Sequence, residues 1–393
     1  MNQGYLFRNV WLVGDDATYA ADMRVRGRRI QEIGSELVPA VNEIVLECSD
    51  YLACPGLINS HDHLQFNLFP RLGEPPYNNA HEWGQDLHTR WRSTLESIQR
   101  VPMRLRLLWG AWKNLLSGTT HVIHHDPYSH YFRFHFPVDV FKRYTFAHSI
   151  YYEPDLRRTL GRRKRGTPFL IHLAEGKDDF AASEVASVMN IGGLDERTVA
   201  VHAINISQSD IDLLQQTKTS VVWCPSSNMF LFEKTAPVPS LLGRICVALG
   251  TDSTLTGSIT LFEEMRCARR ATDISAKDLF RLVTVIPRRI FGLPPDAGAL
   301  IEGGNADLFL LPFGGADPYE RILNANPADI CLMMKRGKIV FFDDRDFAKL
   351  LNGGDDASLR FAGRRKIVRD QRCVELCKTL RPFLDHYSYL SPN

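Results

Sequence analysis

Five residues of metal-binding types stand at the ends of short apolar runs. They are His61, His63, His172, His202 and Asp252. His61 and His63 are two residues apart, so on a β-strand their side chains face the same side and can reach one small cation. A catalytic zinc typically takes three or four protein ligands and keeps a position for water. His172 and Asp252 would complete such a set of ligands.

Each histidine taken alone has a plainer interpretation, because a single histidine at a strand end is more often a hydrogen-bonded structural residue. The His-x-His pair shifts the balance toward a metal, and two further histidines and an aspartate at equivalent positions shift it further. A structural zinc would prefer closed, cysteine-rich ligation, and Cys224 is the only cysteine near these positions. We therefore predict a catalytic metal site.

The middle of the chain alternates strand-like runs with helical stretches. Such alternation predicts a parallel sheet with right-handed crossovers. At this length a (β/α)8-type TIM barrel is favoured over an open doubly wound sheet, because the sequence has neither a GxGxxG motif nor a phosphate loop. In a barrel the chemistry lies at the carboxyl ends of the strands, where the five residues stand. The expected strands are 53–63, 119–125, 144–150, 168–173, 198–203, 220–224 and 245–252.

The two ends of the chain resemble each other, because both alternate apolar and polar residues in short runs broken by Gly and Asp. Such runs are typical of hairpins. We predict that residues 1–52 and 300–345 form one discontinuous small β-sandwich domain and that residues 53–299 form the barrel. Residues 346–393 carry Phe, Leu and Tyr at helical spacing, which predicts a helical extension packed on the barrel or on a partner subunit.

The composition limits the classes of protein and partner. The chain has 393 residues and a formal net charge of +2, which gives no indication of nucleic-acid binding. No apolar run approaches the roughly 18 residues of a membrane span, and no signal peptide is evident. The eight cysteines include no CxxC pair, which indicates free thiols in a reducing compartment. We expect a cytoplasmic protein with a small-molecule partner, no membrane or nucleic-acid partner, and a homo-oligomer as an open alternative.

Several motifs together resemble the deaminase and chlorohydrolase branch of the amidohydrolase superfamily, which includes guanine, cytosine and adenosine aminohydrolases and triazine hydrolases. The resemblance extends from about residue 5 to about residue 342, and the motifs are specific only in combination. They are residues 55–63 (PGLINSHDH), 172–176 (HLAEG), 201–203 (VHA), 224–228 (CPSSN), 249–253 (LGTDS) and 298–308 (GALIEGGNADL).

The resemblance implies a role for each residue of the site. One divalent metal, usually zinc and sometimes iron, would be held by His61, His63, His172 and Asp252. His202 would hydrogen-bond the attacking water or the substrate, and Glu175 would shuttle the proton. The chemistry agrees, since a bound metal lowers the pKa of water from 15.7 toward ~7, Asp252 can accept the released proton, and a nearby carboxyl group can protonate the ring.

These roles predict a hydrolase acting on C–N bonds, with hydrolytic deamination of an amino-substituted N-heterocycle as the first choice. Hydrolysis of a cyclic or linear amide, or dechlorination, at the same mononuclear site is the alternative. A binding protein that kept the fold without the chemistry is disfavoured, because all the named residues are present. A zinc enzyme of the cytidine-deaminase type would need His-x-Glu with Pro-Cys-x-x-Cys, which the sequence lacks.

Two further features concern the wall of the barrel and the pocket. The stretch 126–167 is shorter than in the family, so one strand-helix unit is expected to be shortened or lost. No lysine in it ends an apolar run, so a carboxylated-lysine bridge is not expected and we predict one metal. A loop over residues 75–83 could fold over the site, with Trp83 or Tyr77 stacking on a planar ring. The candidate substrate contacts are Gln65, Trp83, His125 (or its neighbour His124) and His148.

Overall fold

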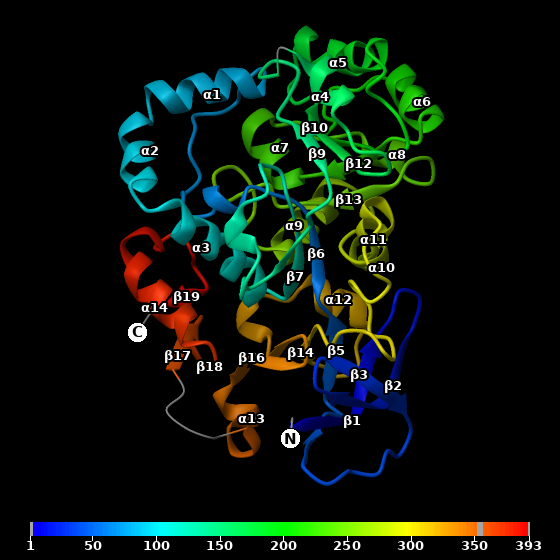
Figure 1. Cartoon of the computed structure of the whole chain (residues 1–393), viewed down its shortest axis with the longest axis vertical. Helices are drawn as coiled ribbons and strands as arrows, with labels where there is room; N and C mark the ends of the chain where they lie inside the picture. Colours follow the sequence, from blue (N-terminus) through cyan, green and yellow to red (C-terminus); the bar gives the residue numbers. More distant parts are fainter. Residues whose placement is uncertain (1–2, 154, 352–356, 392–393) are drawn as a thin grey trace.

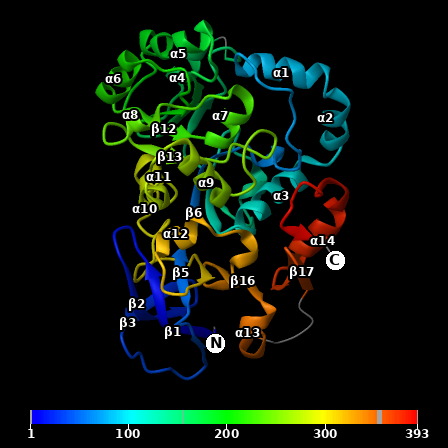
Figure 2. The same ribbon diagram turned by 180° about the vertical axis from the view of Figure 1, so that it is seen from behind.

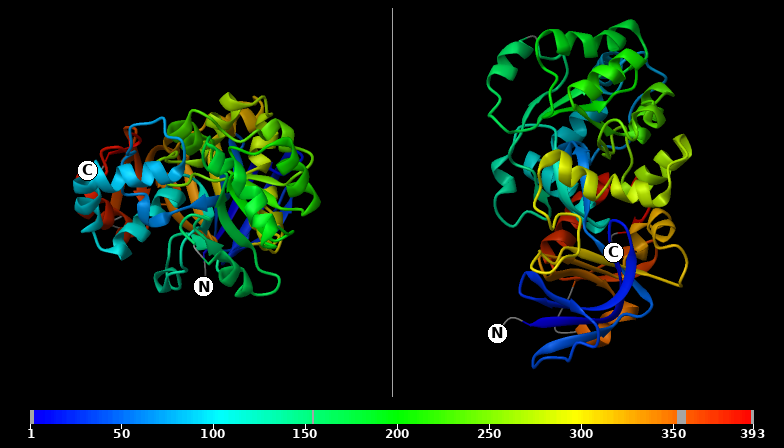
Figure 3. Two further views of the ribbon diagram at one scale, coloured as in Figure 1. Left: turned by 90° about the horizontal axis from the view of Figure 1, so that it is seen from above. Right: turned by 90° about the vertical axis from the view of Figure 1, so that its right-hand side faces the viewer.

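The computed structural model describes residues 3–153, 155–351 and 357–391. It has a larger α/β region in which parallel strands are flanked by helices, and a mixed β-sheet region at the other end (Figure 1). Seen from behind, the first and the late strands of the chain again share the sheet end (Figure 2). The side view separates the same two regions (Figure 3).

The α/β region contains two parallel sheets. The first has the order β13-β12-β11-β10-β9 and the second the order β6-β7-β8. A parallel bridge between Asp62 and Asp252 links the end of β6 to the residues after β13. The strands are β6 (Leu57–Asp62), β7 (Thr119–His124), β8 (Asp139–Val140), β9 (Thr145–Ala147), β10 (Phe169–Leu173), β11 (Thr198–His202), β12 (Ser220–Trp223) and β13 (Val247–Leu249).

Helices follow most of these strands, and several of them begin at side-chain caps. The Asp178 side chain accepts from the amide of Ala181 at the start of α5, and Ser207 and Asp210 form a capping box on α6. Such caps satisfy amide groups that have no partner within the helix. The helices of this region are α1 (Ala80–Thr89), α2 (Arg92–Gln99), α3 (Met103–Leu116), α4 (Leu156–Gly161), α5 (Asp179–Asn190), α6 (Gln208–Gln216), α7 (Pro225–Phe232), α8 (Val238–Leu241), α9 (Leu261–Ala271), α10 (Ala276–Arg281) and α11 (Val285–Phe291).

The stretch 126–167, which was expected to be shortened, contains two short strands and little helix. β8 has two residues and β9 has three. β9 follows β8 with no helix between them, and α4 has six residues. The strand expected over 144–150 is therefore limited to Thr145–Ala147. Among the described residues no hydrogen-bonded strand pair joins β8 to β9, so the two parallel sheets separate at this point.

Both ends of the chain enter one mixed sheet of order β19-β17-β18-β16-β15-β14-β5-β1-β2-β3, with β4 beside β1. The antiparallel pair β5–β14, with Cys54 opposite Phe309, joins the N-terminal and C-terminal parts. The sandwich arrangement and the domain limits stay predictions. The strands outside the C-terminal tail are β1 (Gly4–Val13), β2 (Thr18–Arg26), β3 (Arg29–Gly34), β4 (Glu43–Glu47), β5 (Tyr51–Pro55), β14 (Leu308–Pro312), β15 (Leu332–Lys335) and β16 (Lys338–Asp343).

The expectation of helices throughout 346–393 is wrong for part of this segment. α13 (Asp344–Leu351) and α14 (Gln371–Leu380) are helical, but β17 (Ala357–Phe361) and β18 (Arg364–Val368) form a hairpin and β19 (Leu390–Ser391) pairs with β17. Ala362 and Gly363 both have positive φ, 45° and 82°, as a two-residue hairpin turn requires. Residues 352–356 and 392–393 of the expected extension lie outside the described residues.

No helix in the described ranges is long and apolar enough to cross a membrane.

The C-terminal tail contacts the α/β region, since the Tyr387 ring packs edge-on against Trp109 at 4.9 Å between centroids. The Tyr387 hydroxyl also donates to the backbone carbonyl of Asn67.

The close packing of α3 on the short helix η1 (Leu64–Phe66) gives a first prediction. A Cβ at Gly110 would lie 2.2 Å from the carbonyl oxygen of Leu64, so Gly110→Ala forces α3 away from the strand that carries the histidine pair. We expect a loss of about 1–3 kcal/mol in the free energy of unfolding, the range typical of overpacking, measured by urea denaturation. The control is Gly161→Ala, whose Cβ would meet nothing within 4 Å; equal losses in both variants would contradict the prediction.

Candidate active site

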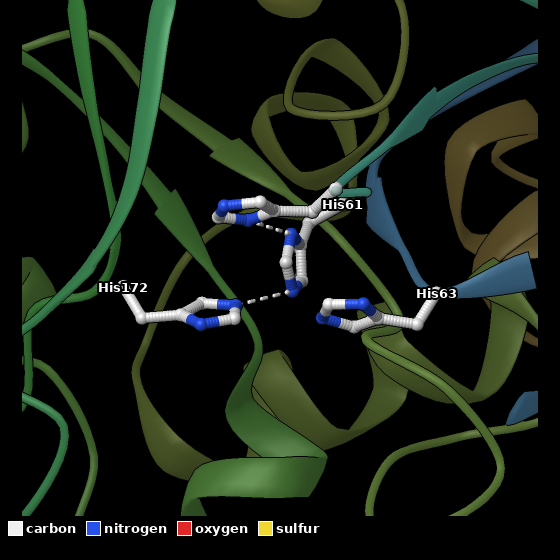
Figure 4. Close-up of side chains that lie close together, drawn as sticks. His61, His63 and His172 are labelled. Atoms are coloured by element: carbon white, nitrogen blue, oxygen red, sulfur yellow. Dashed lines mark hydrogen bonds between the residues drawn. The ribbon is translucent and has the colours of Figure 1, made fainter. Parts of the chain in front are cut away.

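The histidine pair at the end of β6 lies at the centre of the site. His61 is fully buried and His63 nearly so. The Nε2 atom of His61 lies 3.3 Å from Nε2 of His172 and 3.5 Å from Oδ1 of Asp252, and Nε2 of His63 lies 3.7 Å from the same oxygen. Figure 4 shows the rings of His61, His63 and His172 pointing toward one another, with His172 coming from a different strand than the histidine pair. Nε2 of His61 therefore lies close to ligand atoms of both His172 and Asp252, and the same Asp252 oxygen also faces His63.

These separations can be compared with what a metal requires. Ligand atoms arranged tetrahedrally at ~2.0–2.1 Å from a zinc ion lie about 3.3–3.4 Å apart. The observed distances of 3.3, 3.5 and 3.7 Å are close to that spacing. Imidazole nitrogens with one carboxylate oxygen also form a donor set suited to zinc and iron. The residues present therefore fit one divalent ion.

His125 also belongs to the cluster of His61, His63, His125 and His172, whose ligand atoms lie within 4.8 Å of one another. Its nitrogens, however, already have partners. Nδ1 lies 3.3 Å from Nδ1 of His61, and Nε2 lies 3.0 Å from the carbonyl oxygen of Ala147. His125 therefore contacts Nδ1 of His61, whereas Nε2 of His61 faces His172. The expected inward contact of His125 with a substrate does not fit this buried placement.

Asp252 is held so that one oxygen faces the histidines. The hydroxyls of Ser227 and Thr256 donate to Oδ2 at 2.8 and 2.7 Å, which leaves Oδ1 directed at His61 and His63. Burial alone would raise the pKa of Asp252, but the hydrogen bond and charge of His61, with the charge of His63, hold it well below its usual range. The carboxylate is therefore ionised and available as a ligand.

His63 is oriented by a carboxylate on the neighbouring strand. Its Nδ1 lies 2.7 Å from Oδ2 of Asp126, which also accepts from Nε2 of Gln65 at 2.6 Å. Although burial would raise the pKa of Asp126, His63 and Gln65 hold it far below its usual range. The Nδ1–H group of His63 thus donates to a carboxylate, and such a second-layer partner is usual for a metal-binding histidine.

The groups expected to move protons lie beside the four ligands. Oε1 of Glu175 is 3.5 Å from Nε2 of His202. Burial, aided by the charges of Asp252 and Glu184, raises the pKa of Glu175 well above its usual value, which favours the protonated carboxyl group. Nδ1 of His202 lies 2.8 Å from Oδ1 of Asn228, and burial lowers the pKa of His202 to about 4. A neutral His202 donating to Asn228 directs an unprotonated nitrogen at Glu175.

A buried ion pair lies behind the histidine pair and was missed by sequence reasoning. Asp62, between the two histidines, is fully buried with Lys113. Its Oδ2 lies 3.1 Å from Nζ of Lys113 and accepts from Asn114 at 2.7 Å, while Oδ1 accepts from Asn67 at 2.6 Å. Asn59 connects this network to Thr251, the residue before Asp252, through a bond of 2.7 Å. In the sequence, the indication of this ion pair was the acidic residue Asp62 between the two histidines.

The remaining predicted substrate contacts differ in placement. Gln65 is buried, and its Oε1 has no hydrogen-bond partner within the described structure. His148 is exposed and its ring centroid lies 4.7 Å from that of His172 and 6.4 Å from that of His63. Trp83 instead donates its indole N–H to the carbonyl of Leu72 at 3.0 Å, and Tyr77 donates its hydroxyl to Asp86 at 2.6 Å. Gln65 and His148 therefore lie near the centre, whereas Trp83 and Tyr77 are engaged in packing.

The loop before α1 is hydrogen-bonded to the loop that carries Glu175. The amide of Ala80 donates to the carbonyl of Glu175 at 3.2 Å, and the amide of Lys177 donates to the carbonyl of Asn78 at 2.7 Å. A cavity of about 10 Å³ remains beside His148, Glu175 and Tyr152. This space suits about one water molecule.

Comparison with known proteins shows what the chain is similar to. Residues 156–340 match the model of the amidohydrolase family. It is 30% identical over 198 residues to the 5-methylthioadenosine/S-adenosylhomocysteine deaminase of Desulfitobacterium hafniense, an alignment that spans 44% of this chain and only 46% of that protein. It is 26% identical over 341 residues to the 5'-deoxyadenosine deaminase of Methanothrix thermoacetophila, across 74% of this chain and 81% of that protein.

A solved structure shares the fold. The adenosine deaminase from Xanthomonas campestris with bound zinc matches with a TM-score of 0.74 at 17% identity, over 97% of this chain and 98% of that chain. The agreement extends over both the α/β region and the mixed sheet, because nearly all of each chain is covered.

The buried pair of Asp62 and Lys113 gives a second prediction. Lys113→Met leaves the Asp62 carboxylate buried without its cation, and breaking such a pair typically costs about 3–5 kcal/mol. We expect a loss of that size in the free energy of unfolding, measured by urea denaturation. The double variant Asp62→Asn/Lys113→Met removes both charges and is expected to recover part of the loss. A double variant no more stable than Lys113→Met would contradict this account.

Proposed function

We propose that the protein is a metal-dependent hydrolase that acts on C–N bonds and deaminates an amino-substituted N-heterocycle. The observation that carries this proposal is the convergence of His61, His63, His172 and Asp252 beside the buried, protonated Glu175. The names of the similar proteins, which are deaminases of adenosine derivatives, support the same reaction class.

We also propose that the two parallel sheets form one distorted (β/α)8-type barrel that is open between β8 and β9. The bridge between Asp62 and Asp252 and the likeness to the adenosine deaminase structure support this arrangement. Residues 53–299 would form the barrel, with the mixed sheet of both chain ends as the smaller domain. The four ligands and Glu175 would then lie at the carboxyl ends of the strands, where barrels carry their chemistry.

One divalent ion, zinc before iron, would be held by Nε2 of His61, His63 and His172 and by Oδ1 of Asp252. When bound, such an ion supplies a polarised water whose pKa is near ~7. We propose a single ion, because Lys113, the buried lysine behind the site, is committed to Asp62 and His125 is committed to His61 and Ala147.

Glu175 carries the proton transfers, and His202 orients the water. Glu175, protonated at the start, donates to a ring nitrogen of the substrate as water adds to the carbon that carries the amino group. Its carboxylate then takes one proton from that water and passes it to the departing ammonia, and it takes the second proton of the water as the C=O bond forms, which restores the protonated acid. Nε2 of His202, unprotonated because Nδ1 donates to Asn228, accepts a hydrogen bond from the attacking water and orients it.

Gln65 and His148 are proposed as substrate contacts. Asp126 fixes the amide nitrogen of Gln65, so the unpartnered Oε1 presents an acceptor for a ring N–H or an exocyclic amine. His148 is exposed beside His172, where its ring can stack on or hydrogen-bond a planar heterocycle. Tyr152, which packs edge-on to His148 at 4.9 Å, would have to move to admit such a ring.

The reaction class is tested by incubating the metal-loaded protein with purines, pyrimidines, pterins and triazines and measuring released ammonia. Release of ammonia with an oxygen in place of the amino group is expected. Ring opening without ammonia, or release of chloride from chlorinated triazines, would favour amide hydrolysis or dechlorination by the same groups.

The third prediction concerns Glu175. Glu175→Gln keeps the shape of the side chain and all four proposed ligands but removes the proton-transfer group, so we expect metal content to be unchanged and turnover to fall by about 10²–10⁴-fold. Metal is measured by elemental analysis and turnover by ammonia release. Glu96→Gln, on the exposed surface of α2, is the control and should keep its activity. Near-native turnover in Glu175→Gln would remove this residue from the mechanism.

The fourth prediction concerns Asp252. Asp252→Ala removes a ligand oxygen, so both metal content after dialysis and turnover should fall strongly. Ser227→Ala removes only one of the two hydroxyls that orient the carboxylate and should lose less of each. Unchanged metal content in Asp252→Ala would show that Asp252 is not a ligand.

A further inference from the structure

His125 occupies an unusual position beside the proposed metal site. It directly follows β7 and its side chain is 1% exposed. Its two nitrogens face different partners, Nδ1 of His61 at 3.3 Å and the carbonyl oxygen of Ala147 at 3.0 Å. His61 lies in β6 and Ala147 lies in β9, so these two contacts fix the ring between the two strands.

These two contacts determine where the protons lie. A carbonyl oxygen can only accept, so Nε2 of His125 carries the hydrogen. A neutral imidazole then has its lone pair on Nδ1, and the side chain is only 1% exposed, where a second proton would bury a charge without a counter-ion. Nδ1 of His125 therefore accepts a hydrogen bond from Nδ1–H of His61. The lone pair of His61 is left on Nε2, the atom that faces His172 and Asp252.

We propose that His125 is a positioning residue that holds His61 as the Nδ1–H tautomer and so directs its Nε2 lone pair at the divalent ion. The inference rests on the metal site of the proposed function. It places adjacent residues of one strand end, His125 and Asp126, behind the two members of the His-x-His pair. Metal-binding histidines commonly donate their second N–H to a carboxylate, backbone carbonyl or water, whereas His61 donates to an imidazole.

The neutral partner has an electrostatic consequence. The His-x-His pair already faces two carboxylates, because Oδ1 of Asp252 and Oδ2 of Asp126 both lie next to His63, and two carboxylates match the charge of one divalent ion. A second carboxylate at position 125 would add an unbalanced negative charge to a buried site, which is costly. An imidazole orients His61 without that charge.

The test uses two replacements of His125 in the full-length protein. His125→Phe keeps a ring of similar volume and removes the acceptor, whereas His125→Asn places an amide oxygen close to the position of Nδ1. Zinc affinity is measured on the metal-free proteins by competition with a chromophoric chelator. We expect His125→Phe to bind zinc about 10–100-fold more weakly, the range typical for loss of such a partner, and His125→Asn to recover most of that affinity. Thermal unfolding of the metal-free proteins separates this effect from loss of the fold.

A second readout does not depend on zinc. In ¹⁵N-histidine NMR spectra of the metal-free protein, with His61 assigned by comparison with His61→Asn, the wild type should show the Nδ1–H tautomer of His61 and His125→Phe should not. If His125→Phe does not fold, the wild-type spectrum decides, and an Nε2–H tautomer of His61 overturns the inference. Equal zinc affinity in wild type and His125→Phe overturns the positioning role alone, whereas a wild-type protein that binds no divalent ion overturns the proposed function with it.

Discussion

The site depends on the backbone hydrogen bonds that join the end of β6 to the residues after β13. The amide of Asp252 donates to the carbonyl of His61 at 3.0 Å, and the amide of His63 donates to the carbonyl of Asp252 at 2.8 Å. These bonds bring the aspartate beside a histidine pair that is far away in sequence. The approach requires Gly250, because a Cβ at that position would lie 2.6 Å from Cβ of His61 and 2.7 Å from its amide nitrogen. The two segments that carry these proposed ligands are thus held together by backbone pairing.

The second constraint is the number of charges that this small buried volume contains. An isolated charge is costly to bury, and a buried pair is stable only when its hydrogen-bonding capacity is met. Asp62 meets this condition behind the strand through Lys113 and the neighbouring asparagines. Asp126 meets it through His63 and Gln65. Asp252 has two hydroxyl donors on one oxygen and leaves the other for a cation. Glu175 faces Nε2 of His202 at 3.5 Å, and burial raises its pKa well above its usual value.

The sequence was sufficient to predict the parts of the site that follow from strand periodicity. His61 and His63 had to share a face, and residues ending parallel strands had to meet at one edge, so the convergence with His172 and Asp252 followed from local pattern. The partner of His61 was not predictable in this way. It depends on the register that sets Asp62 beside His124 across β6 and β7, and on the position of Ala147 in the adjacent β9. The register between strands and the tautomer of His61 both depend on tertiary contacts. The sequence showed only that His125 follows a strand, which suggested a contact with the substrate.

The fold was predictable to a similar degree. Alternating strands and helices were enough to indicate parallel sheets, but the missing helix between β8 and β9 could be inferred only as a shortage of residues. The hairpin of β17 and β18 was misassigned because apolar residues near it also fit helical spacing. Its conformation is fixed by the turn at Ala362 and Gly363 and by the pairing of β18 with β16, in which Ile367 lies opposite Phe342. Pairing with a distant strand overrode the local preference.

The position of Glu175 depends on a part of the chain that is distant in sequence. The carbonyl of Glu175 accepts from the amide of Ala80, and the amide of Lys177 donates to the carbonyl of Asn78, so the start of α1 and the loop that carries the proposed acid are held by the same bonds. These bonds fix the backbone of Glu175, while its side chain lies 3.5 Å from Nε2 of His202. Because backbone and side chain are both held, the carboxyl group stays beside the converging histidines. The burial that raises its pKa follows from the same packing.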